Sequence, residues 1–136
     1  MDTLKTKIEA AILGEYTSIY KFCRAIDDRT DGGTEDRTAG LLGGAIREWA
    51  QCTKDARNEY ESIKRACTNN IQTLNATQVI HWEIDATRVA GYNAKAQAQV
   101  EIIKTLCYII GVESATMQAI FTVANYTALN QEGLLL

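Results

Sequence analysis

The feature that most constrains this chain is the complete absence of proline from its 136 residues. Proline lacks a backbone N–H and clashes with the preceding helical turn, so it is the strongest helix breaker among the amino acids. A chain of this length ordinarily contains several prolines. Without them helices can run uninterrupted, and long helices become the leading expectation.

Length and composition indicate one domain, residues 1–136. The chain is long enough to bury one continuous core and too short for two ordinary ones. Hydrophobic residues make up 46% and charged residues 23%, close to the average of globular proteins, which argues against disorder. We expect an all-α fold: an elongated helical bundle of about four helices built on a long antiparallel helical hairpin.

Apolar side chains recur at helical spacing in four segments. The first, from Leu4 to Ile26, predicts a helix over 2–27 that ends at the Asp- and Gly-rich segment 27–33. The second predicts a helix over 36–68, capped by Thr34. Its apolar seam consists of Leu42, Ala45, Trp49, Cys52, Ala56, Tyr60, Ile63 and Cys67.

The third segment predicts a helix over 71–110, with a seam from Trp82 to Ile110 in which Asn93 is the one polar member. Because 100–112 is rich in β-branched residues, a buried strand is the alternative there. Gly111 ends this helix, and Glu113 or Ser114 begins a short last one that closes at Gly133. The predicted buried face of the last helix consists of Met117, Ile120, Phe121, Ala124 and Ala128.

A hairpin that turns near Asn69 places Trp49 opposite Ala90 and Trp82 opposite Ala56. In this register the helix over 36–68 reaches only to about residue 100 of its partner, so the apolar stretch 100–110 lacks cover. We therefore predict self-association there. The predicted residues are Val100, Ile103, Leu106, Ile110, Phe121, Leu134, Leu135 and Leu136.

Two points about this surface stay open. The helix over 2–27 folding back over 100–110 would instead give a closed four-helix monomer. Asn93 either fixes register and oligomeric state, as single polar residues in a heptad seam do, or is an ordinary hydrogen-bonded side chain.

No residue pattern indicates catalysis, a metal or a cofactor. The single histidine, His81, has Gln78 three residues before it, so the Glu-x-x-His pairs of di-iron bundles are missing. The four cysteines are too widely spaced for zinc, and we expect them to be free and buried. The loop 27–38 resembles a calcium loop but has Arg29 and Thr38 at ligand positions. We therefore expect that this protein is not an enzyme.

Charge and hydropathy narrow the partners to proteins. The net charge is −3 and no basic cluster is present, which argues against nucleic acid. The stretch 105–131 carries one charge, Glu113, but its Gln, Asn and Thr residues favour a buried pair of helices over a membrane span. The first apolar run, Ile8 to Leu13, is interrupted by Glu9, so no secretion signal is predicted and a cytoplasmic location is expected.

The Ala- and Gln-rich run from Tyr92 to Val100 is similar to stretches in the helical internal or ejection proteins of tailed phages. This resemblance implies a structural role in a virus particle assembled in the cytoplasm. Together with the seams, it leads us to expect a non-enzymatic structural or assembly component that associates with copies of itself. The alternative is a small intracellular interaction module that binds one protein partner.

Overall fold

The computed structural model describes residues 1–27, 33–69 and 76–131, and the side chains of 1–27, 33–65 and 86–128. Over these residues the chain forms five helices and no strand. The predicted all-α fold is confirmed, and the alternative of a strand over 100–112 is wrong because the helix continues to Ile110. The helices are α1 (Asp2–Ala11), α2 (Ile19–Ile26), α3 (Thr34–Asn69), α4 (Ala76–Ile110) and α5 (Ser114–Gln131).

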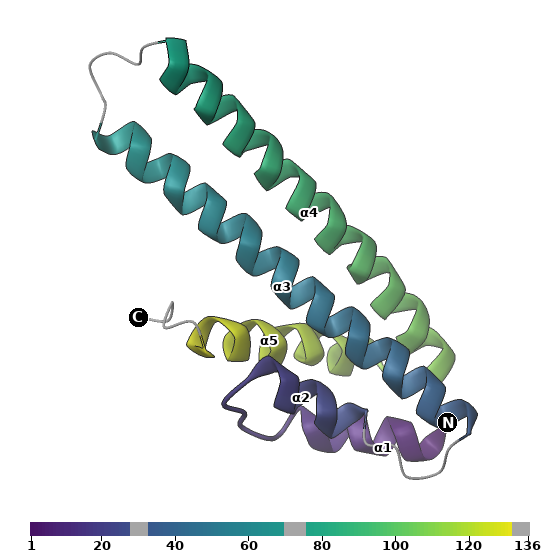
Figure 1. Ribbon diagram of the computed structural model, residues 1–136. Coiled ribbons are helices and arrows are strands. Elements are labelled where there is room, and N and C mark those ends of the chain that lie inside the picture. Colours follow the sequence, from purple (N-terminus) through teal and green to yellow (C-terminus); the bar gives the residue numbers. More distant parts are fainter. Residues whose placement is uncertain (28–32, 70–75, 132–136) are drawn as a thin grey trace.

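The two longest helices, α3 and α4, form the predicted antiparallel hairpin, and the other three helices pack at one end of it (Figure 1). We call this end the body. The other end projects beyond α1, α2 and α5 as a two-helix arm (Figure 1). We define the arm as residues 57–69 and 76–95, which lie beyond the buried residues Ala56 and Ala96. The molecule is therefore elongated, as the sequence predicts.

The predicted helix over 2–27 is wrong, because the chain breaks between Ala11 and Ile19. Ser18 caps α2, its Oγ accepting a hydrogen bond from the Lys21 N–H at 3.2 Å. The carbonyl of Ala11 accepts hydrogen bonds from the Tyr16 hydroxyl at 2.7 Å and the Gly14 N–H at 3.1 Å, and these two bonds fix the turn that follows α1. As a result α2 folds back beside α1, and both helices pack against the rest of the body (Figure 1).

The core of the body joins all five helices. Cys23 of α2 approaches α3 closely: a Cβ at Gly43 would lie 3.4 Å from the Cys23 carbonyl oxygen. The absence of a side chain at Gly43 thus lets the backbones of α2 and α3 approach each other. The largest fully buried side chains are Phe22, Leu4, Ile8, Ile26, Leu42, Ile46, Ile103, Ile120 and Cys107.

Gly111 ends α4, as predicted. Its φ of +85° lies in the left-handed region that favours glycine. The Val112 N–H bonds to the Cys107 carbonyl at 2.9 Å and the Gly111 N–H to the Tyr108 carbonyl at 3.2 Å, which is a Schellman motif. The chain then reverses into α5. Of the predicted buried face of α5, Ile120, Ala124 and Ala128 are buried and Met117 and Phe121 are half-buried.

The predicted register of the hairpin is wrong. The connection is centred between Asn69 and Ala76 rather than near Asn69, so Thr34 at the start of α3 lies level with the end of α4 (Figure 1). Trp49 packs against Phe121 of α5, with ring centroids 5.0 Å apart. Ala90, its predicted partner, is exposed. The Trp82 side chain lies outside the described residues. No described helix is both long and apolar enough to cross a membrane.

Candidate functional site

Among the described residues, no three His, Cys, Asp or Glu side chains lie close enough together to hold a metal ion. His81 and Cys67 lie outside the described side chains. Cys23, Cys52 and Cys107 are free and buried, as predicted. Burial raises the pKa of Cys23 to about 12 and that of Cys107 to about 11. These protonated thiols are poor nucleophiles and poor metal ligands.

Several residues predicted to mediate self-association lie inside the chain's own core. Ile103 has no exposed surface, and Leu106 and Ile110 are also buried. The expectation that 100–110 lacks cover is therefore wrong, for two reasons: α3 runs alongside α4 to its end, and the folded-back α1 and α2 close the body. Val100 and Phe121 are half-buried, and 134–136 lie outside the described residues.

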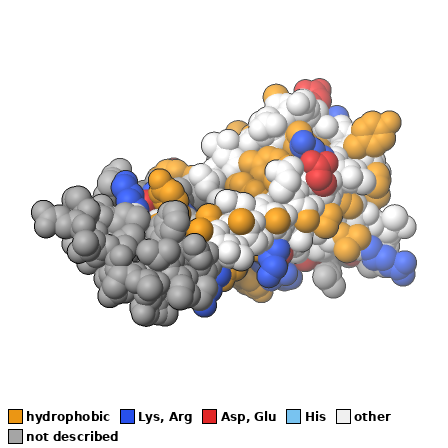
Figure 2. Space-filling model, turned by 90° about the horizontal axis from the view of Figure 1, so that it is seen from above, with side chains coloured by type: hydrophobic (Ala, Val, Ile, Leu, Met, Phe, Trp, Pro, Cys, Tyr) orange, Lys and Arg blue, Asp and Glu red, His pale blue; other side chains and the backbone are white. Residues whose placement is uncertain are grey.

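The opposite face of α4 remains exposed and carries a stripe of uncharged side chains. We call it the outer stripe: Thr87, Gly91, Ala94, Ala98, Ile102, Thr105 and Ile109. Its members recur in steps of three and four residues and repeat after eleven, which keeps them on one line of a nearly straight helix. Ile102 is 44% and Ile109 56% exposed. Figure 2, seen from the side where α4 is uppermost, shows hydrophobic side chains in a row along this face.

Asn93 is exposed on α4, so its predicted place in the hairpin seam is wrong. Ala96, 8% exposed, lies against α3 instead. Charged residues flank the outer stripe: Arg88 and Lys95 follow one edge. Lys104 forms an ion pair with Glu101 at 3.6 Å near the other edge.

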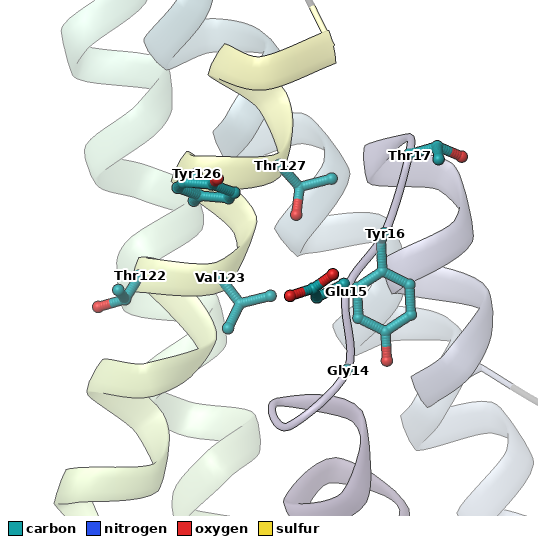
Figure 3. Close-up of a pocket in the computed structure, with 8 residues that line it drawn as sticks. All are labelled: Gly14, Glu15, Tyr16, Thr17, Thr122, Val123, Tyr126 and Thr127. Atoms are coloured by element: carbon teal, nitrogen blue, oxygen red, sulfur yellow. The ribbon is translucent and has the colours of Figure 1, made fainter. Parts of the chain in front are cut away.

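A pocket of about 560 Å³ lies between the α1–α2 connection and the C-terminal half of α5 (Figure 3). It is within the usual size range of small-molecule sites. The connection is positioned by the Tyr16 hydrogen bond to α1 and by the packing of the Tyr16 ring on Phe22, 5.2 Å between centroids. The residues lining the pocket are Gly14, Glu15, Tyr16, Thr17, Thr122, Val123, Tyr126 and Thr127.

The pocket combines one carboxylate with hydroxyl groups and aromatic rings. The Glu15 carboxylate lies between Tyr16 and α5, and the Thr127 hydroxyl points into the same space (Figure 3). Burial raises the pKa of the Tyr16 phenol, which therefore stays protonated at neutral pH. Sequence reasoning missed this pocket because it placed Gly14 to Thr17 inside a continuous helix.

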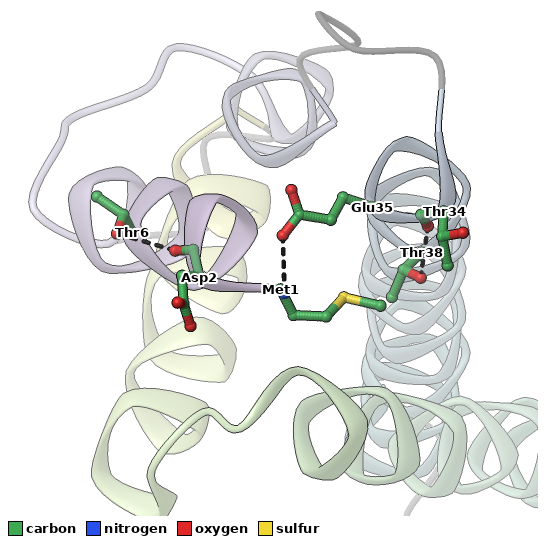
Figure 4. A network of polar contacts seen from close by, with 6 residues as sticks. All are labelled: Met1, Asp2, Thr6, Thr34, Glu35 and Thr38. Atoms are coloured by element: carbon green, nitrogen blue, oxygen red, sulfur yellow. Dashed lines mark hydrogen bonds and ion pairs between the residues drawn. The ribbon is translucent and has the colours of Figure 1, made fainter.

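A second polar cluster ties the start of α1 to the start of α3 (Figure 4). The α-ammonium group of Met1 lies 3.1 Å from a Glu35 carboxylate oxygen. The Thr6 and Thr38 hydroxyls each donate to a carbonyl four residues earlier in their own helices. The ion pair joins the two helices and the hydroxyl bonds lie within them, so we interpret the cluster as structural.

Comparison of the chain with models of protein families, with curated proteins and with solved structures found no match.

Proposed function

We propose that this protein is a non-enzymatic structural or assembly component whose copies associate through the outer stripe of α4. The observation that carries the proposal is the exposure of this uncharged line of side chains from Thr87 to Ile109, about 33 Å long at 1.5 Å per residue. Exposed apolar surface of this extent marks interaction sites on proteins.

The order of residue sizes favours a second copy in antiparallel orientation. Small residues occupy the half of the stripe in the arm, and isoleucines occupy the half in the body. An antiparallel pair centred on Ala98 sets small side chains opposite large ones, which lets two helices approach without voids. The resulting pairs are Thr87 with Ile109, Gly91 with Thr105, Ala94 with Ile102, and Ala98 with itself.

The expected association is weak. A strip about 33 Å long and about 10 Å wide on each copy buries about 660 Å² in total, which is less than stable specific interfaces bury. We expect a dissociation constant on the order of 10 µM. Weak contacts suit a component that is held at high local concentration, as it would be inside a virus particle. The phage-like run Tyr92 to Val100 lies in the middle of this stripe.

Disulfide trapping tests both the surface and its orientation. Ala94→Cys and Ile102→Cys chains, mixed under mild oxidation, should form a mixed disulfide faster than either forms one alone, because the antiparallel pair brings these two positions together. Asn93→Cys, exposed on another face of α4, is the matched control. Faster trapping of Ala94→Cys with itself would indicate a parallel pair instead.

Sedimentation equilibrium supplies the second measurement. Ala98→Glu sets two carboxylates against each other in the antiparallel pair and should weaken association at least tenfold, whereas Asn93→Glu adds the same charge off the stripe and should not. A 15.0 kDa monomer at every concentration up to about 200 µM would contradict the proposal. It would leave the alternative, a module whose α4 face binds one different protein.

A further inference from the structure

We propose that the pocket between the α1–α2 connection and α5 binds a small organic molecule that carries a protonated amine on an apolar or aromatic body. This site is separate from the outer stripe of α4 and independent of the proposed assembly. The argument starts from the charge of the pocket. Glu15 is its only ionisable carboxylate, and no Lys, Arg or His lines it.

The Glu15 carboxylate forms no ion pair or hydrogen bond with any other side chain that the structure describes, although it lies between the connection and α5 (Figure 3). An anionic ligand would meet this charge without compensation. Glu15 is exposed, so water solvates its carboxylate in the free protein. A ligand cation would replace this water and gain a charge-assisted hydrogen bond.

Thr127 adds a second polar group. Its residue is only 2% exposed, and its hydroxyl points into the pocket (Figure 3). An ammonium N–H placed between the Glu15 carboxylate and the Thr127 hydroxyl could donate to both oxygens.

The walls indicate the rest of the ligand. The Tyr16 and Tyr126 rings and the Val123 side chain line the pocket on either side of Glu15 (Figure 3). Tyrosine faces attract cations and also cover apolar groups. Tyr126 is 61% exposed, so its ring has room to move onto a bound molecule. A primary amine attached to a ring meets each of these surfaces.

The test uses phenethylamine as the probe, with 2-phenylethanol and phenylacetate as neutral and anionic analogues of similar size. We expect NMR titration of the folded protein to give a dissociation constant on the order of 1 mM for phenethylamine, with shifts confined to residues 14–17 and 122–127. The two analogues should bind at least fivefold more weakly. Equal binding of 2-phenylethanol, or shifts elsewhere, would overturn the proposal.

Two variants probe the recognition. Glu15→Gln should weaken phenethylamine binding about five- to tenfold, whereas Glu9→Gln, an exposed carboxylate of α1 away from the pocket, should leave it unchanged. Thr127→Val keeps the side-chain shape and should weaken binding about threefold, because it removes an acceptor for the ammonium group.

Unchanged binding by Glu15→Gln would show that the carboxylate does not hold the amine and would contradict the site. Ala98→Glu, which targets the outer stripe, should bind phenethylamine like the unaltered chain, so failure of the pocket and failure of the assembly are separable.

Discussion

The buried thiols of Cys23 and Cys107 determine how the folded protein responds to alkaline pH. Their pKa values are raised from 9.0 to about 12 and about 11, because burial disfavours the thiolate. Above pH 9 the unfolded chain loses these protons and the folded chain keeps them. Stability therefore falls as pH rises from about 9, by up to about 1.4 kcal/mol per pH unit for each thiol.

Urea denaturation at pH 8 and pH 10 measures this loss. The variant with Cys23→Ala and Cys107→Ala should lose less stability between the two pH values than the unaltered chain does. Equal losses would mean that the two thiols do not contribute. In the folded protein at pH 8, a thiol reagent should label Cys23, Cys52 and Cys107 slowly, because all three are buried.

Gly111 and Gly44 should respond in opposite directions to the same substitution. Gly111 has φ +85°, so Gly111→Ala should destabilise the protein by about 1 kcal/mol. Gly44 lies inside α3 with open space where a Cβ would stand, so Gly44→Ala should stabilise it by about 0.5 to 1 kcal/mol. Thermal denaturation measures both. A stabilising Gly111→Ala would contradict the Schellman ending of α4.

At the level of the helices, sequence periodicity predicted α3, α4 and α5 to within a few residues, because their apolar faces are regular and Gly111 is a strong stop signal. It failed between Ala11 and Ile19, where the Tyr16 hydroxyl bonds to the end of α1 and the Ser18 side chain caps the start of α2. Both are short-range hydrogen bonds that apolar spacing does not reveal.

The register and the candidate site depended on information that periodicity lacks. Moving the centre of the hairpin by a few residues covers the inward-facing side chains of 100–110, Ile103, Leu106 and Ile110 among them. The apolar seam alone does not specify where a connection turns. The pocket joins residues 14–17 to 122–127, more than a hundred positions apart, so it follows only from the packing of α5 against the folded-back N-terminal segment. The exposed stripe of α4 was readable in the sequence and was overlooked.

Body and arm should differ in their tolerance of side-chain truncation. Ile46 is fully buried in the body, so Ile46→Ala should cost about 2 to 5 kcal/mol of unfolding free energy. Ile63 lies half-buried in the arm, so Ile63→Ala should cost about 1 kcal/mol. Chemical denaturation compares the two. Equal costs would show that the arm is as tightly packed as the body.

At the scale of the whole molecule, two isoleucines of α4 separate folding from assembly. Ile103 is buried in the body, so Ile103→Asp places an unpaired charge in the core and should unfold the chain. Ile109 belongs to the outer stripe, so Ile109→Asp should leave the helical circular dichroism unchanged and abolish the dimer. A folded Ile103→Asp protein would contradict the closed body.

The projecting arm also governs how the protein diffuses. A particle with two long antiparallel helices extending from one end experiences more friction than a sphere of its mass, and it tumbles faster about its long axis than across it (Figure 1). On a size-exclusion column a 15.0 kDa monomer of this outline elutes early, at a volume typical of a heavier globular protein. A monomer could therefore be mistaken for a dimer from its elution volume alone. Its association has to be measured by a method that reports molecular mass, such as sedimentation equilibrium.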